Sequence, residues 1–181
     1  MVIPKTQIFM FKKILPAMAL LALCIQPIQA QQKEQTKTGF EKYQESGGTL
    51  PELKIVTGKY KTFTNEDFKS KHHFFLVMFN PTCGHCIKMT KLICANAGLF
   101  KDTKVAFMAP ASMLSYLNDF YTETQVFKHP DFVVGVDSAY AVDKLYTYGT
   151  LPQINIYDKH AKLVKTFKGD TPLDSLKHYL P

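Results

Sequence analysis

The segment HFFLVMFNPTCGHC, residues 73–86, places an apolar run directly before a Cys-x-x-Cys pair. Its first seven residues form an uninterrupted run that favours β-structure, so we expect a strand buried on both faces. After Cys86, Met89 and Ile93 recur at helical spacing, and Gly98 is expected to end that helix. The two cysteines therefore lie where a strand leads into a helix.

The position of the pair indicates redox chemistry. The unpaired amides and the positive dipole end at a helix start favour a thiolate, so Cys83 is predicted to be the nucleophile. Cys86 lies one turn further on the same side, where it can attack a mixed disulfide and release the substrate, which makes it the resolving thiol. Gly84 and His85 separate them. His85 adds a donor, and a charge when protonated, that is expected to stabilise the reduced pair and to make the disulfide more oxidising.

The rest of the chain alternates strands with helices. Further strands are expected at residues 53–56, 59–63, 104–109, 132–136, 153–157 and 162–167, and further helices at residues 112–124 and 138–146. Short helices are expected after Thr64, where Asp67 has capping spacing, and after Thr171, with Pro172 at the first position. This order predicts an α/β fold, a three-layer sandwich whose mixed central sheet carries helices on both faces.

The order strand, Cys-x-x-Cys, helix and then Pro152 before a hairpin resembles the thioredoxin superfamily from about residue 50 to the end. The motif Cys-Gly-His-Cys is similar to that of protein disulfide isomerase domains. The hairpin before the first buried strand and the long stretch between Cys94 and Pro152 resemble the TlpA-like branch of bacterial exported thioredoxins. The resemblance implies that Pro152 is cis and faces the dithiol, and that the backbone of Leu151 pairs with the substrate chain.

Three positions depart from the family pattern. Thr82 stands where thioredoxins usually have Trp, and Gln153 stands where Thr commonly follows the proline. Val77 stands where thioredoxin has a buried acid that relays a proton to the resolving cysteine. We expect Thr82, Leu151 and Pro152 to contact substrate, with a docking surface unlike that of thioredoxin.

A second function stays open, because zinc sites also use Cys-x-x-Cys spacing. Cys83, Cys86 and His85 could hold copper or zinc in a thioredoxin-like module that handles metal. Three ligands from one short segment cannot complete a tetrahedral site without a fourth ligand from elsewhere in the chain. We therefore expect no metal and no other cofactor. Cys94 lies roughly 16 Å along the helix from Cys83, outside disulfide reach, and is predicted to be a core thiol.

The first 30 residues have the pattern of a secretory signal peptide. Lys12 and Lys13 precede an apolar run at residues 14–25, and Ala30 closes the segment, with cleavage expected after it. An uncleaved membrane anchor is the alternative, and Met10 is an alternative start. The predicted organisation is a signal peptide at residues 1–30, a flexible lead-in at residues 31–50 and a thioredoxin-like domain at residues 51–181, exported to the periplasm or beyond.

Composition and compartment suggest the partners. All 22 basic residues are lysines, which argues against specific nucleic-acid binding because arginine supplies the bidentate contacts to guanine and phosphate. We expect a monomeric thiol-disulfide oxidoreductase whose partners are exported proteins with thiols or disulfides and an unidentified redox protein. The Gly-His pair favours oxidation of substrates, whereas the TlpA-like resemblance favours reduction, so the direction stays open.

Overall fold

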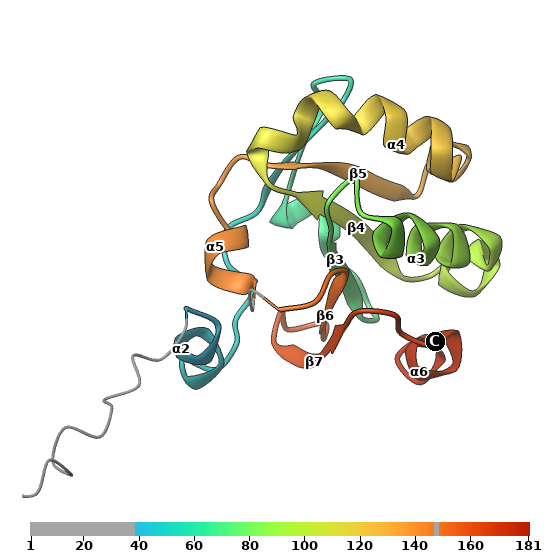
Figure 1. Ribbon diagram of the computed structural model, residues 1–181. Coiled ribbons are helices and arrows are strands. Elements are labelled where there is room, and N and C mark those ends of the chain that lie inside the picture. The colour runs from blue at the N-terminus through green and yellow to red at the C-terminus, as the bar shows by residue number, and fades with distance from the viewer. Residues whose placement is uncertain (1–38, 147–148) are drawn as a thin grey trace, which may run out of the picture. The chain divides into compact units, whose positions relative to one another are not determined.

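The computed structural model describes residues 39–146 and 149–181, and the predicted signal peptide lies outside these ranges. The described chain contains one seven-stranded sheet with the order β2-β1-β5-β4-β3-β6-β7 (Figure 1). Its strands are β1 (Lys54–Thr57), β2 (Thr62–Thr64), β3 (Phe74–Met78), β4 (Lys104–Ala109), β5 (Phe132–Asp137), β6 (Gln153–Tyr157) and β7 (Leu163–Lys168).

The sheet is mixed, as expected. The central strands β3, β4 and β5 run parallel, while β1 pairs antiparallel with β5 and β2, and β6 pairs antiparallel with β3 and β7. In the β3 and β6 pair, Met78 lies opposite Gln153. The end of β3 and the start of β6 are therefore neighbours at one edge of the sheet, and this edge carries the candidate site.

Helices cover both faces of the sheet, which confirms the predicted α/β sandwich (Figure 1). One face packs against α3 (Gly84–Ala95), α4 (Leu117–Thr124) and α6 (Leu173–Lys177). The other packs against α2 (Gly39–Glu45), η4 (Asn65–Phe68) and α5 (Val142–Leu145). Side chains of β3 alternate between the two cores, with Val77 in the first and Met78 in the second. Both faces of β3 are thus covered, which explains its unbroken apolar sequence.

Three helices differ from their predicted bounds. The helix after the cysteines ends at Ala95 rather than at Gly98, because the side-chain amide of Asn96 donates to the carbonyl of Leu92 at 2.9 Å. A 3₁₀ helix, η5 (Ala97–Phe100), then follows. The helix predicted at residues 112–124 begins as a 3₁₀ segment, η6 (Ala111–Tyr116), and becomes α-helical only in α4.

The helix predicted at residues 138–146 is reduced to one turn, α5. The carboxylate of Asp137 accepts hydrogen bonds from the backbone N–H groups of Ala139, at 2.9 Å, and Val142, at 2.7 Å. These bonds hold the chain in a turn and delay helix formation until Val142.

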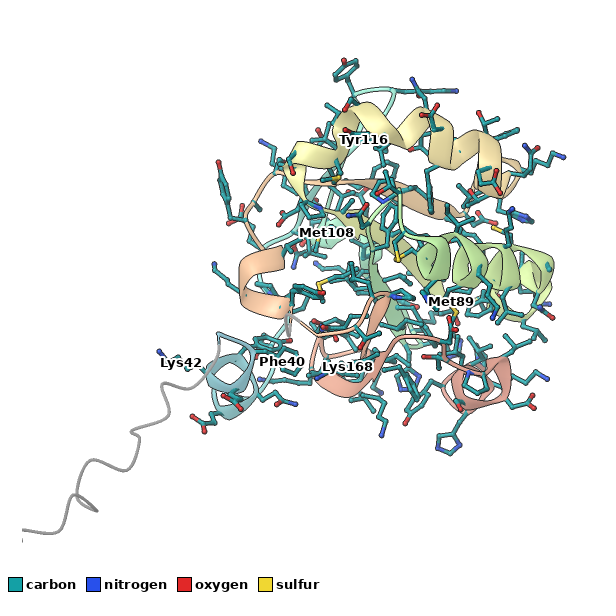
Figure 2. The ribbon with its side chains drawn as sticks, in the orientation of Figure 1. Phe40, Lys42, Met89, Met108, Tyr116 and Lys168 are labelled. Atoms are coloured by element: carbon teal, nitrogen blue, oxygen red, sulfur yellow. The ribbon has the colours of Figure 1, made fainter. Side chains whose placement is uncertain are left out.

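Part of the segment predicted as a flexible lead-in, residues 31–50, forms the helix α2. Phe40 and Tyr43, three residues apart on α2, are buried against the domain. Figure 2 shows Phe40 directed from α2 toward the body of the domain and Lys42 directed away from it. None of the helices within the described ranges is long and apolar enough to span a membrane.

Candidate active site

A turn between β3 and α3 places the first cysteine. The side-chain oxygen of Asn80 accepts hydrogen bonds from the backbone N–H and the hydroxyl of Thr82, both at 2.9 Å. The carbonyl of Asn80 accepts the N–H of Cys83 at 3.0 Å. Cys83 is the N-cap of α3 with extended backbone angles, φ −85° and ψ 119°, and its carbonyl accepts the N–H of Ile87 at 3.0 Å. The thiol therefore lies at the start of the helix, as predicted.

The two thiols differ in their surroundings. Cys83 is partly exposed, whereas Cys86 is 0% exposed and belongs to the core beneath α3. The pKa of the Cys86 thiol is raised to about 12, mainly by burial. A backbone hydrogen bond with Asn80 acts in the opposite direction, and the hydrogen bond with Cys83 and the charge of that residue add smaller increases. One thiol is accessible and the other is shielded and protonated, which is the asymmetry that a nucleophile and a resolving thiol require.

The segment before β6 lies beside this turn. Because Met78 lies opposite Gln153, Leu151 and Pro152 fall at the same sheet edge as the residues that follow β3. The Leu151–Pro152 bond is cis, as the resemblance implied. Leu151 is partly buried against the same core as Cys83.

A third segment reaches the site from the other end of the chain. The imidazole Nδ1 of His85 lies 3.1 Å from both carboxylate oxygens of Asp170, which follows β7. The Nζ of Lys88 lies 3.8 Å from Oδ2 of the same carboxylate. The hydrogen bond from His85, followed by the charge of Lys88, holds the pKa of Asp170 below its usual value. Sequence reasoning missed Asp170, since no local pattern signals a contact across 85 residues.

A shallow groove adjoins this pair between α3 and the start of α6. Its volume is about 550 Å³, and Asp170, Lys88 and Pro172 lie on its walls together with Met89. Figure 2 shows Met89 at the side of α3 that faces α6. The accessible surface beside the dithiol therefore combines apolar contacts with a charged cluster.

All three departures from the family pattern now have a location. Val77 is buried in the same core as Cys86, so no acid occupies the position from which a proton relay would act. Gln153 is fully buried, and its side-chain amide donates to the carbonyl of Leu145 at 2.7 Å and to Asn155 Oδ1 at 3.0 Å. Its side chain belongs to the interior and not to the docking surface. Thr82, by contrast, is exposed next to Cys83.

Metal ligands do not gather within residues 39–146 and 149–181. No group of three or more His, Cys, Asp or Glu side chains in these ranges has the arrangement of a metal site. Cys94 packs partly buried against the core under α3, where burial raises the pKa of its thiol to about 11.

Comparison with known proteins gives matches at the level of structure. No protein-family model matches the chain, and no curated protein matches its sequence. A thioredoxin domain of a thiol-disulfide oxidoreductase from Bacteroides vulgatus superposes with a TM-score of 0.60 at 16% identity, over 75% of this chain and 97% of that domain.

Two further solved structures give the same picture. StoA from Bacillus subtilis matches with a TM-score of 0.56 at 16% identity, over 72% of this chain and 96% of that chain. The pneumococcal exposed lipoprotein thioredoxin Etrx1 from Streptococcus pneumoniae matches with a TM-score of 0.55 at 20% identity, over 71% and 96% of the two chains. At these identities the likeness shows the fold. The chain therefore has the thioredoxin fold, which the order of strand, Cys-x-x-Cys and helix led us to expect.

Proposed function

We propose that this protein is a thiol-disulfide oxidoreductase that exchanges disulfides with exported proteins through Cys83 and Cys86. The observation that carries the proposal is the contrast between the partly exposed thiol at the start of α3 and the buried thiol one turn later. The Cys83 sulfur is accessible to solvent and to a substrate, whereas the Cys86 sulfur is buried and reacts only after Cys83.

The reaction follows from this arrangement. In the reducing direction, the Cys83 thiolate attacks one sulfur of a substrate disulfide, a mixed disulfide forms, and the other substrate sulfur leaves as a thiolate. Cys86 then loses its proton and attacks the Cys83 sulfur, which releases the second substrate thiolate. The two cysteines end as a disulfide, and the substrate has gained the two electrons that they lost. Oxidation of a substrate dithiol is the same sequence in reverse.

The substrate and the compartment are part of the proposal. Thr82 is exposed next to Cys83, and Leu151 and Pro152 precede β6 at the same end of the sheet. An extended substrate chain would contact these three residues. Export is inferred from the signal-peptide pattern of residues 1–30. A separate redox protein, not yet identified, would restore the dithiol or the disulfide after each turnover.

Trapping of mixed disulfides tests the proposal. Replacing Cys86 with Ala removes the resolving thiol and leaves the nucleophile, so substrate proteins are expected to accumulate as stable adducts on Cys83. Non-reducing gels of exported proteins from cells carrying each variant would show the adducts, and mass spectrometry would identify the linked cysteine. The Cys83→Ala variant is expected to trap nothing.

Cys94→Ala is the matched control, because it removes a partly buried thiol from the same helix without touching the Cys-x-x-Cys pair. It is expected to keep wild-type reduction of insulin by dithiothreitol. Adducts on Cys94, or an insulin rate for the wild-type protein equal to the dithiothreitol background, would contradict the proposed function.

A further inference from the structure

A second groove lies at the opposite end of the sheet from the dithiol. The strands β3, β4 and β5 run parallel, so the end of β3, which leads to Cys83, and the start of β5 lie at opposite ends of the sheet. The groove adjoins the start of β5 and has a volume of about 680 Å³. The described residues that line it include neither cysteine of the pair and neither Leu151 nor Pro152. A partner bound in this groove would leave the dithiol accessible.

The groove exists because β1 pairs only with the second half of β5. β1 ends at Thr57, so residues 132–134 have no strand partner on that side within the described chain. The hydroxyl of Tyr121, on α4, donates to the carbonyl of Val134 at 2.7 Å. A Cβ atom added at Gly58 would lie 3.1 Å from the ring of Tyr121, so the loop after β1 packs closely against that ring. Packing and a hydrogen bond therefore hold this part of the groove in place.

Apolar side chains from several segments line the groove. The short 3₁₀ helix η7 (Val126–Lys128) contributes Val126 and Phe127, β2 contributes Phe63, and the turn before β5 contributes Pro130. Phe127 is 60% exposed, although it is a large apolar side chain. Contiguous apolar surface with polar residues around it marks a site of interaction, and exposed aromatic residues are frequent anchors at such sites.

The ionisable side chains around the groove are basic. Lys59, Lys61 and His129 line it, and within the described ranges no Asp or Glu does. Neither lysine forms an ion pair with a described residue. The Nζ of Lys61 lies 4.5 Å from the centre of the Phe63 ring, which places a positive charge directly beside the apolar wall. Asp131, the acid nearest in sequence to His129, lines a different pocket.

We propose that this groove is a docking site for an extended peptide segment of a partner protein, in which acidic residues flank an apolar anchor. Charge complementarity selects the acidic class, because the lysines at the groove have no carboxylate opposite them. The groove is open to solvent, so it would enclose a small ligand less completely than a small-molecule pocket does, whereas a peptide chain can lie along it. This inference does not depend on the redox activity of the protein.

Binding of a synthetic peptide to the full-length protein tests the inference. The probe is a short fluorescein-labelled peptide in which glutamate alternates with leucine, and the matched peptide has lysine in place of each glutamate. Fluorescence polarisation at low ionic strength measures both affinities. We expect the acidic peptide to bind saturably and the basic peptide to bind at least about fivefold more weakly.

The apolar anchor is tested by Phe127→Ala, which is expected to weaken binding of the acidic peptide by about fivefold or more. Leu99→Ala is the matched control, because Leu99 is an exposed apolar residue of another 3₁₀ helix, η5, and does not line the groove. It is expected to bind the acidic peptide as the wild-type protein does. Both variants are expected to keep the wild-type rate of insulin reduction, since neither residue belongs to the dithiol site.

Charge reversal tests the basic side of the groove. Lys61→Glu is expected to weaken the acidic peptide by about fivefold and to strengthen binding of the basic peptide. Lys165→Glu is the matched control, because the Nζ of Lys165 also lies over the ring of a phenylalanine two residues later, Phe167, at 5.6 Å, but outside the groove. This control variant is expected to keep the wild-type affinity for both peptides.

Four outcomes would overturn the inference. They are the absence of saturable binding of the acidic peptide, binding that is unchanged in Phe127→Ala and Lys61→Glu, an equal loss in Lys165→Glu, and dimerisation of the wild-type protein that Phe127→Ala abolishes. The third would indicate attraction to the whole basic surface, and the fourth would assign the groove to a second copy of the chain. A protein that binds the peptide as expected but does not reduce insulin would refute the proposed function and leave the docking site supported.

Discussion

At the scale of single residues, the exposure and pKa of each thiol in the site depend on its surroundings and not on the residue type alone. Cys83 and Cys86 are chemically identical and three positions apart, yet one lies at an open helix start and the other is enclosed by the core. Burial withholds water from a thiolate and so disfavours it, which is the main reason for the raised pKa of Cys86. The order of attack in the proposed reaction is set by this difference.

Selective alkylation is expected from the same difference. At pH 8, iodoacetamide is expected to modify Cys83 while Cys86 and Cys94 stay unmodified, because burial raises the pKa of these two thiols to about 12 and about 11. Peptide mass spectrometry after a time course would locate the label. In urea all three are expected to react, which controls for intrinsic reactivity. Modification of Cys86 as fast as Cys83 in the folded protein would show that it is not shielded.

The pH dependence of Cys86 has a definite sign. Its thiol is a group whose pKa rises on folding from 9.0 to about 12, so the folded state favours the protonated form. The resulting stabilisation is fully present below pH 9 and is lost as the pH rises toward 12. Alkylation of Cys86 in the folded protein is accordingly expected to keep accelerating up to about pH 12 instead of levelling off near pH 9.

Sequence patterns predicted the central residues of the candidate site, because these residues are close in sequence or belong to a recurrent order of strands and helices. Cys83, His85 and Cys86 share one turn, and Pro152 was placed by its position before a hairpin. Asp170 could not be found in this way, since it reaches His85 only when the loop after β7 folds back over α3. The burial of Gln153 was equally hidden, because it depends on which face of β6 the side chain takes.

At the scale of elements, strands were predicted better than helices. The bounds of β4 and β6 agree with the predicted residues 104–109 and 153–157. In β4 a nearly continuous apolar run identifies a strand buried on both faces. In β6, Gln153 and Asn155 alternate with isoleucines, and this period of two also favours a strand. Helix bounds differed from prediction where a polar side chain hydrogen-bonds to the backbone. Asn96 does so at the end of α3, and Asp137 does so before the start of α5. Such hydrogen bonds depend on conformation and leave little trace in the hydrophobic pattern.

The pairing of β5 with β1 depends on a glycine. A Cβ atom added at Gly135 would lie 2.5 Å from the carbonyl oxygen of Val56, and backbone cannot move away as a side-chain end can. Gly135→Ala is therefore expected to lower the free energy of unfolding by about 1 to 3 kcal/mol, measured by urea denaturation. Gly98→Ala is the control, since a Cβ there meets no atom within 4 Å. Equal stability of the two variants would mean that β1 and β5 are not so closely paired.

At the scale of the whole domain, the described chain from residue 39 onward joins two cores through the sheet. The hydroxyl of Tyr43 on α2 donates to the carbonyl of Gly48 at 2.7 Å and lies 3.2 Å from the hydroxyl of Tyr157 on β6. Asn155 and Gln153 continue this chain of buried polar groups along β6 toward Pro152. The segment before the first strand thus supplies one end of this chain of buried hydrogen-bonded groups.

The segment containing α2 is expected to unfold together with the rest of the domain, and not to fray independently. Phe40 is 6% exposed in the core that also contains Phe74 and Leu145, so Phe40→Ala is expected to lower the free energy of unfolding by about 3 kcal/mol. The loss would be seen as a lower urea midpoint at an unchanged slope, because a single cooperative transition loses stability without changing the surface that it exposes. Lys42→Ala, which alters an exposed side chain of the same helix, is expected to stay within about 0.5 kcal/mol of wild type. If both variants unfolded at the wild-type midpoint, α2 would detach before the domain unfolds, and the buried polar groups of β6 would be open to water while the dithiol site remained folded.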